Sequence, residues 1–300
     1  MRVLVTGAGG YVGSAVVTAV AAAGHEPVAM LHGDQAVPGS VEARIAELLD
    51  QASLVAAVAG VDAVCHLAGL AQARESWDRP LDYFEVNVGG TVALLKAMRA
   101  EGIGRLVFAS TGSIYGSPEH QPMSEELPDA PPHPYAASKV AAESAIDWEA
   151  CRGQLAAAVL RLFNGAGGQD PDSTRIVPRV LAVAAGDTPS LGVNGDGSAT
   201  RDYLHVQDAA EAFVAALDRG PEHGTVRRYN IGSGTGASIM DVVAAAERVT
   251  ARTVPVVHKP PAAEPPMLVC DPSRALAELG WKPRRSDLDT ILRDAWTARG

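Results

Sequence analysis

Short apolar runs and longer segments of helical periodicity alternate along the first third of the chain. The runs are typical of strands buried in a parallel sheet and cover residues 3–5, 27–31, 61–67 and 106–110. The segments with apolar residues at helical spacing are 11–23, 41–60 and 80–100. Strands that alternate with helices in this way predict an α/β fold, with a doubly wound parallel sheet.

A glycine-rich turn joins the first predicted strand to the first predicted helix. It places Gly7, Gly10 and Gly13 at intervals of three residues. Without Cβ atoms, these positions allow positive φ, a close approach of the backbone to a pyrophosphate, and tight packing of the helix on its strand. The amides at the helix start would bind the phosphates. A merely flexible turn is the alternative, but the strand before it and the helix after it favour a dinucleotide site.

The second predicted strand lacks the acidic residue that usually binds the adenosine ribose at its end. It ends at Leu31, His32 and Gly33, and Asp34 follows too late. With no carboxylate at that point to repel a 2′-phosphate, the pattern leaves both NAD and NADP open. His32 could face such a phosphate or be an unpaired surface histidine.

Hydroxyl groups gather after the fourth strand, and a tyrosine–lysine pair follows a proline-rich loop. Ser110, Thr111 and Ser113 stand at the carboxyl end of that strand. Tyr135 and Lys139 are four residues apart on a predicted helix, so both side chains can point into one cleft. We expect Lys139 to lower the pKa of Tyr135 from about 10 and make it a general acid and base. The same spacing is common on solvated helices, but together with the glycine turn it indicates catalysis.

These motifs belong to an ordered set along the whole chain: Thr6–Gly13, His66–Gly69, Asn87, Ser110–Thr111, Tyr135–Lys139, Leu160–Asn164, Gly195–His205, Tyr229–Gly234 and Leu279–Pro283. The set resembles the extended short-chain dehydrogenase/reductases, in their nucleotide-sugar epimerase/dehydratase branch. The resemblance implies a Rossmann-like domain over residues 1–164. A smaller, mixed α/β substrate lobe would cover 165–300, with segments near 200–208 and 226–234 crossing back.

The resemblance also implies roles for individual residues. Tyr135 would be the acid and base, Lys139 would bind the nicotinamide ribose, and Thr111 would bind the reacting sugar hydroxyl. The other implied cofactor residues are Gly7, Gly10, Tyr11, Val12, Gly13, His32, Glu47, Leu48, Leu67, Ala68, Gly69, Asn87 and Phe163. The other implied substrate residues are Ser113, Asn164, Arg175, Val193 and Arg201. Arg201 suits a bidentate phosphate contact, whereas Arg175 stands where the family commonly has an asparagine.

The residues after Thr111 separate the reactions of this family. Relatives that eliminate water resemble the chain but carry an acidic pair there, and sugar-acid decarboxylases carry a nearby glutamate. Here the positions are Gly112 and Ser113, which favours epimerisation of a nucleotide-diphosphate sugar at C4, by transient oxidation with NAD. Two alternatives stay open: an NAD(P)H-dependent 4-keto-nucleotide-sugar reductase, and a dinucleotide-sensing protein without turnover.

The composition limits the partners and the compartment that can be expected. The formal net charge of −10 argues against a nucleic-acid surface, and no apolar run has membrane-spanning length. A strand that begins at Arg2 leaves no room for a signal peptide. Cys65, Cys151 and Cys270 lack metal-ligand spacing, so we expect buried thiols in the cytoplasm and no metal site.

Three tryptophans bear on packing and assembly. Trp77, Trp148 and Trp281 are interpreted as packing residues rather than base-stacking platforms. The resemblance implies a homodimer formed through the helices that follow Pro80 and Tyr135. Both helices are rich in alanine and could pack closely against a second copy.

Overall fold

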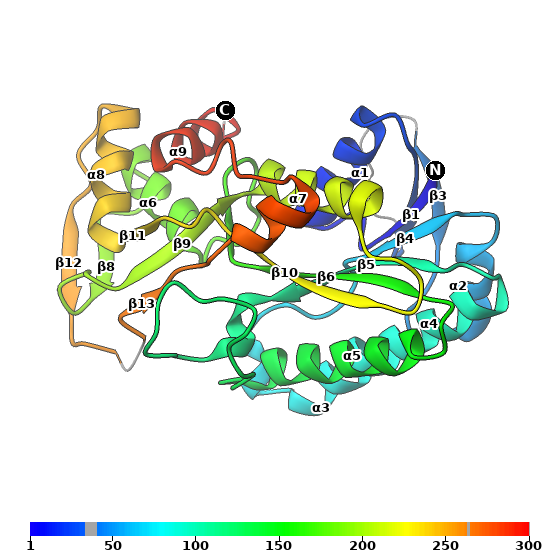
Figure 1. Cartoon of the computed structure of the whole chain (residues 1–300). Coiled ribbons are helices and arrows are strands. Elements are labelled where there is room, and N and C mark those ends of the chain that lie inside the picture. The colour runs from blue at the N-terminus through cyan, green and yellow to red at the C-terminus, as the bar shows by residue number, and fades with distance from the viewer. Residues whose placement is uncertain (34–40, 263–264, 300) are drawn as a thin grey trace.

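A parallel sheet forms the centre of the computed structural model, which describes residues 1–33, 41–262 and 265–299 (Figure 1). Its strand order within the described residues is β10-β6-β5-β4-β1-β2-β3, and every neighbouring pair is parallel. The bounds are β1 Arg2–Thr6, β2 Glu26–Leu31, β3 Glu42–Ile45, β4 Ala63–His66, β5 Arg105–Thr111, β6 Ala156–Leu162 and β10 Val226–Ile231. The predicted Rossmann-like doubly wound fold is confirmed. Asp34 lies outside the described residues.

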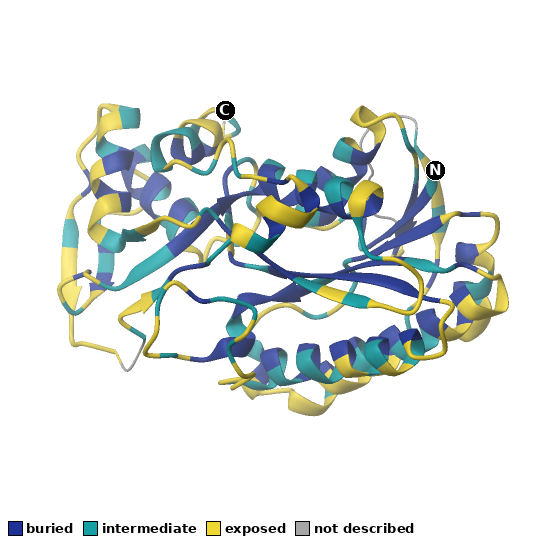
Figure 2. Cartoon of the chain, in the orientation of Figure 1, coloured by how far each residue is buried: buried dark blue, intermediate teal, exposed yellow. Residues whose placement is uncertain are grey.

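Helices cover both faces of the sheet (Figure 1). One face carries α1 Tyr11–Ala22 and α7 Val206–Arg219; the other carries α2 Gln51–Val58, α4 Gly90–Ala100 and α5 Pro134–Ala150. Each face has its own apolar core, with Val16 and Phe213 in the first, and Leu54 and Ile146 in the second. Figure 2 shows the central strands as mostly buried, which explains their near-continuous apolar sequences.

The segment 41–60 is not one helix, so that prediction is wrong. It contains the edge strand β3, a loop and then α2. Val41, Ala43 and Ile45 recur every second residue, which is the period of a strand. Arg44 ties the strand to the end of α2, since its Nη1 donates to the carbonyls of Ala57 and Ala59 at 2.7 and 2.8 Å.

The helix predicted over 80–100 is confirmed as a continuous helical segment with a wider turn inside it. It consists of α3 Pro80–Phe84, the π-helical turn η2 Glu85–Gly89, and α4. A π-turn inside an α-helix is a frequent feature of functional sites. Here it carries Asn87, one of the predicted cofactor residues.

A smaller mixed α/β lobe follows β6, as predicted. Its main sheet contains β7 Asn164–Ala166, β9 Thr200–His205, β11 Gly236–Ser238 and β13 Met267–Leu268, with only β11 antiparallel to β9. A second pair joins β8 Leu191–Asn194 to β12 Val256–Lys259. The helices α6 Ile176–Ala185, α8 Ile239–Thr250 and α9 Leu288–Thr297 pack around a separate core.

The chain passes between the two parts along β9 and β10. After β9, α7 packs on α1, and β10 lies beside β6 at the edge of the large sheet. Buried Asp202 on β9 accepts hydrogen bonds from the amides of Ser233, Gly234 and Cys270. Its carboxylate therefore holds the segment after β10 against the smaller lobe.

Some surface expectations are wrong. Trp281 is buried, but Trp77 and Trp148 are 64% and 75% exposed and do not pack in the core. All three cysteines are free, and Cys151 is exposed, unlike Cys65 and Cys270.

Within the described ranges, no helix combines the length and apolarity needed to cross a membrane. No group of three or more His, Cys, Asp or Glu side chains in those ranges could hold a metal ion.

Candidate functional site

The turn between β1 and α1 requires glycine for steric reasons. Gly7 has a φ of +68°, and a Cβ there would lie 2.8 Å from the nitrogen of Ala68. A Cβ on Gly13 would lie 2.0 Å from the carbonyl oxygen of Gly7, so the start of α1 is packed directly against the turn. Gly10 is the N-cap of α1 and has no side chain to cap the first amides. The turn is therefore a cradle suited to a pyrophosphate.

Thr6 fixes the end of β4 beside this turn. Its Oγ1 accepts hydrogen bonds from the amides of Leu67 and Ala68 at 3.1 and 3.0 Å, and lies 2.8 Å from Nδ1 of His66. Burial, followed by the charge of Lys139, lowers the pKa of His66 to about 3. The neutral ring can therefore accept a hydrogen bond from the Thr6 hydroxyl. This role of Thr6 was not predicted from the sequence, although the residue directly precedes the glycine turn.

Asn87 links the loop after β4 to the helix of the tyrosine–lysine pair. Its Oδ1 accepts from the amide of Leu70 at 2.8 Å, and its Nδ2 donates to the Leu70 carbonyl and to Oγ of Ser138. Gly69 has a φ of +150°, and a Cβ there would lie 2.6 Å from Oδ1 of Asn87 and 3.9 Å from Nζ of Lys139. Gly69, Asn87 and Lys139 are thus brought together.

The three predicted catalytic residues also meet, at the carboxyl end of β5. The hydroxyl of Thr111 lies close enough to Tyr135 to act on its pKa, and it donates to Oγ of Ser113 at 3.0 Å. Thr111 also caps the short helix η3 Gly112–Tyr115 by accepting from the amide of Ser113 at 3.1 Å. Lys139 is 5% exposed, and its Nζ donates to the carbonyl of Ala109 at 3.0 Å. One strand end therefore positions both the hydroxyl and the ammonium.

The expected effect of Lys139 on Tyr135 is wrong. Burial raises the pKa of Tyr135 to about 12, while the Thr111 hydrogen bond and then the charge of Arg175 act to lower it. Burial also lowers the pKa of Lys139 to about 8, with Glu143 acting in the opposite direction. The i, i+4 spacing did not predict this, because the Lys139 ammonium is directed to a strand carbonyl.

Arg175 links the glycine turn to the smaller lobe. It is the N-cap of α6, and its guanidinium lies 5.6 Å from the ring centre of Tyr11. Asp170 and Asp172 each hold the guanidinium, with nitrogen–oxygen distances of 3.3 Å. The Tyr11 hydroxyl donates to the carbonyl of Gly167 at 2.5 Å. Of these contacts, the sequence predicted only that Tyr11 and Arg175 belong to the site.

The end of β2 does have a carboxylate beside it, contrary to expectation. Glu47, in the loop after β3, lies 2.6 Å from Nδ1 of His32. The next residue, Leu48, packs against α4, where a Cβ on Gly90 would lie 2.9 Å from that of Leu48. The helix wrongly predicted over 41–60 concealed this arrangement, because β3 brings Glu47 back to the β2 end.

The remaining predicted substrate residues lie toward the smaller lobe. Asn164 on β7 donates to the carbonyl of Asp202 at 2.9 Å, and Arg201 on β9 donates to the carbonyls of Thr200 and Pro265. Val193 is buried on the separate β8–β12 pair. Phe163 packs over η3, since a Cβ on Gly112 would lie 2.7 Å from its ring.

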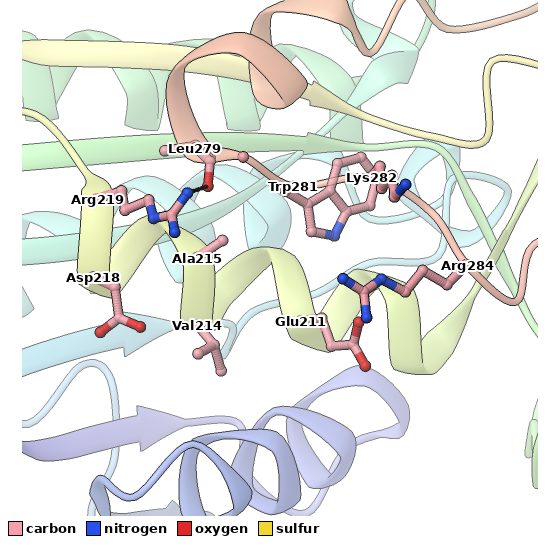
Figure 3. A pocket seen from close by; sticks show the side chains of 10 residues that line it. Glu211, Val214, Ala215, Asp218, Arg219, Leu279, Trp281, Lys282 and Arg284 are labelled. Atoms are coloured by element: carbon pink, nitrogen blue, oxygen red, sulfur yellow. Dashed lines mark hydrogen bonds between the residues drawn. The ribbon is translucent and has the colours of Figure 1, made fainter.

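A pocket of about 230 Å³ lies apart from these residues, between α7 and residues 279–284 (Figure 3). Trp281, Lys282 and Arg284 form one side of it, and Glu211, Val214 and Asp218 of α7 form the other. It contains none of the predicted site residues.

Comparison with known proteins settles the family. Residues 3–232 match the model of the NAD dependent epimerase/dehydratase family. The chain belongs to this family. As a family member, it is 40% identical to a UDP-glucose 4-epimerase of Streptomyces lividans, over 98% of this chain and 95% of that one.

Solved structures show the same relationship for this family member. A UDP-glucose 4-epimerase from Stenotrophomonas maltophila, with bound NAD and formylated UDP-arabinopyranose, matches it with a TM-score of 0.94 and 32% identity, covering 100% of this chain and 98% of that one. The enzyme from Bifidobacterium longum, in complex with NAD⁺ and UDP, matches with a TM-score of 0.90 and 27% identity, covering 100% and 98%.

Proposed function

We propose that this protein is an NAD-dependent UDP-sugar 4-epimerase. The observation that carries the proposal is the meeting of Thr111, Tyr135 and Lys139 at one strand end, beside the Gly7–Gly13 turn. The relatives described above are UDP-glucose 4-epimerases, and some hold NAD together with a UDP-containing ligand. Gly112 and Ser113 offer no carboxylate for elimination or decarboxylation, which supports epimerisation.

The residues around the glycine turn fit NAD. A Cβ at Gly7 or Gly13 would collide with backbone, which leaves a close approach open to a pyrophosphate at the first turn of α1. Tyr11 and Val12 would complete that contact, and Leu67, Ala68, Gly69, Asn87 and Phe163 would line the rest. When bound, NAD would supply the redox chemistry, as acceptor and later donor of the hydride at sugar C4.

The protein supplies position and proton transfer. In this proposal, Tyr135 acts as a phenolate, which the positive charge of bound NAD⁺ would favour against the effect of burial. The phenolate removes the proton from the C4 hydroxyl, and Thr111 hydrogen-bonds and aligns the same oxygen. Lys139 is fixed by the Ala109 carbonyl and would bind the nicotinamide ribose. Asn164 and Arg201 would hold the diphosphate while the 4-keto sugar rotates and presents its other face to the nicotinamide. Tyr135 then returns the proton, so each cycle restores its starting state.

A direct assay tests this function. Purified protein is mixed with UDP-glucose and a small amount of NAD, and nucleotide sugars are separated by chromatography. We expect reversible formation of UDP-galactose without net accumulation of NADH. A requirement for stoichiometric NADPH and a 4-keto sugar would instead identify a reductase, and dinucleotide binding without any sugar turnover would identify a sensor.

Glu47 gives a prediction about cofactor choice. Its carboxylate, beside His32 at the end of β2, would repel the 2′-phosphate of NADP. We expect NAD to bind better than NADP, and Glu47→Gln to reduce that preference about fivefold, since a charge–charge contact of this kind is worth roughly 1 kcal/mol. Titration calorimetry with NAD and with NADP, on the wild type and the variant, measures the ratio of the two dissociation constants. An unchanged ratio in the variant would show that other residues exclude the phosphate.

We also propose a homodimer formed through α3 and α5, which pack side by side (Figure 1). Trp77, Leu81 and Trp148, on or next to these helices, are 64%, 79% and 75% exposed, and large exposed apolar side chains are typical of interfaces. We expect Trp148→Glu to convert the dimer to a monomer, as measured by light scattering at micromolar concentration. The control, Leu276→Glu, changes another exposed apolar residue and should leave the dimer intact. A monomeric wild type would refute the proposal.

The cytoplasm is the compartment that we propose. The three cysteines are free thiols, and Cys151 is exposed at the end of α5. A reducing compartment keeps such a thiol unpaired.

A further inference from the structure

The catalytic helix α5 begins with a histidine cap. His133 is its N-cap residue, with an extended backbone at φ −154° and ψ 162°. Its Nδ1 accepts a hydrogen bond from the amide of Ala136 at 3.1 Å, and its carbonyl accepts from the amide of Ala137. Pro134 has no amide to donate. The imidazole therefore satisfies an amide directly after Tyr135, at the first turn of the helix.

The same imidazole packs on the catalytic ring. The rings of His133 and Tyr135 are nearly parallel, at an interplanar angle of 8°, with their centres 5.8 Å apart. Tyr83 of α3 approaches Tyr135 edge-on, at 6.3 Å and 71°. Tyr135 thus contacts two aromatic rings, one of which is also the helix cap.

The cap requires an unprotonated nitrogen. Nδ1 accepts a hydrogen bond only when it carries no proton, and an imidazolium would face the positive end of the helix dipole. Burial lowers the pKa of His133 below its ordinary value of 6.5. As pH falls through that lowered pKa, the ring gains a proton and the cap is lost.

Neighbouring charges are not the cause of the lowered pKa of His133. The elements that pack against α5 include η1 Glu75–Trp77, α3, η2 and η3. Their titratable or charged groups, with those of the adjacent loops and of α5 itself, are Glu75, Arg79, Asp82, Tyr83, Glu85, Tyr115, Asp129, Tyr135, Lys139 and Arg175. Arg79 pairs with Glu75 and Asp82. The pKa of His133 is set by burial and by its own backbone instead.

We propose that His133 is a positioning residue for Tyr135: its neutral imidazole fixes the start of α5 and the catalytic ring, and its protonation releases both. Turnover is then acid-sensitive through a residue that touches neither cofactor nor reacting atoms. This inference rests on the proposed role of Tyr135 in epimerisation. Its structural half, the cap, holds whatever the reaction.

Two variants separate the cap from the titration. His133→Asn keeps a strong N-cap acceptor but does not titrate, and His133→Ala removes the cap. Rates of UDP-glucose epimerisation are measured from about pH 5 to about pH 9, the range around histidine ionisation. We expect wild-type kcat to fall about fivefold on the acid side, the equivalent of one lost cap. His133→Asn should lose this acid limb, and kcat of His133→Ala should stay about fivefold below the wild-type maximum at every pH. KM should change little in both.

Urea unfolding over the same pH range provides a readout independent of turnover. Because the pKa of His133 is lowered in the folded state, its contribution to stability is complete above 6.5 and is lost as pH falls. That loss should disappear in His133→Asn. An unchanged acid limb of kcat in His133→Asn, or full kcat in His133→Ala, would overturn the proposal. A wild type that unfolds as expected but does not epimerise would refute the proposed function instead.

Discussion

Replacing Tyr135 with phenylalanine should reduce kcat by roughly 10² to 10⁴, because it removes the proposed acid and base and little else. The phenylalanine ring keeps the parallel contact with His133 and the edge contact with Tyr83. NAD binding and the free energy of unfolding should therefore stay close to wild type. Chromatography of UDP-glucose and UDP-galactose measures the rate, and titration calorimetry measures NAD binding.

Tyr83→Phe is the matched control for this experiment. Tyr83 belongs to the same aromatic group, but its hydroxyl donates to the carbonyl of Gln72 at 2.7 Å, and the proposed reaction gives it no role. Its loss should cost a single hydrogen bond of about 1 kcal/mol in stability and leave kcat within a small factor. If Tyr135→Phe turns over at the wild-type rate, Tyr135 is not the acid and base and α5 does not carry the catalytic centre. The hypothesis of a dinucleotide sensor would then have to be reconsidered.

The parts of the site that local sequence determines were predictable. A glycine turn between a strand and a helix depends on steric limits within a few residues, and Gly7 and Gly13 have those limits in the structure. Tyr135 and Lys139 meet Thr111 because the carboxyl ends of parallel strands and the helices after them converge on one edge. The fold followed from the same alternation of strands and helices.

Tertiary contacts could not be predicted in this way. Glu47 reaches His32 because β3 adds to the sheet edge. The sequence did not predict this pairing, because residues 41–60 contain both strand and helix spacing of apolar residues. Lys139 is directed to the Ala109 carbonyl, and Arg175 from the smaller lobe acts on Tyr135. Both effects depend on side-chain direction and on distant segments, so spacing along one helix gave the wrong direction for the Tyr135 pKa.

A buried charge network extends from the catalytic helix into the sheet. Glu143, one turn after Lys139, is 2% exposed, and its carboxylate accepts from Nη2 of Arg161 at 2.8 Å and from Nε of Arg228 at 2.9 Å. Ser110 on β5 also donates to it. Arg161 is equally buried and donates to the hydroxyl of Tyr115 at 3.0 Å. One carboxylate therefore joins α5 to β5, β6 and β10.

Glu143→Ala should destabilise the protein by about 3 to 5 kcal/mol, because it leaves the buried guanidinium of Arg161 without its main counter-charge. Urea unfolding measures the free energy. Asp147→Ala is the matched control: Asp147 is on the same helix and also pairs with Arg228, but its side chain is 40% exposed. Its loss should cost at most about 1 kcal/mol.

The milder Glu143→Gln connects this network to the chemistry. Burial lowers the pKa of Lys139 to about 8, and the charge of Glu143 is what opposes that shift. Without that charge, Lys139 should lose its proton at lower pH, so NAD binding should weaken on the alkaline side sooner than in wild type. Calorimetric NAD titrations at several pH values measure the change. If NAD binding weakens at the same alkaline pH in the variant while stability falls, Glu143 stabilises the fold alone. Lys139 would then stay protonated because of groups in the cofactor site.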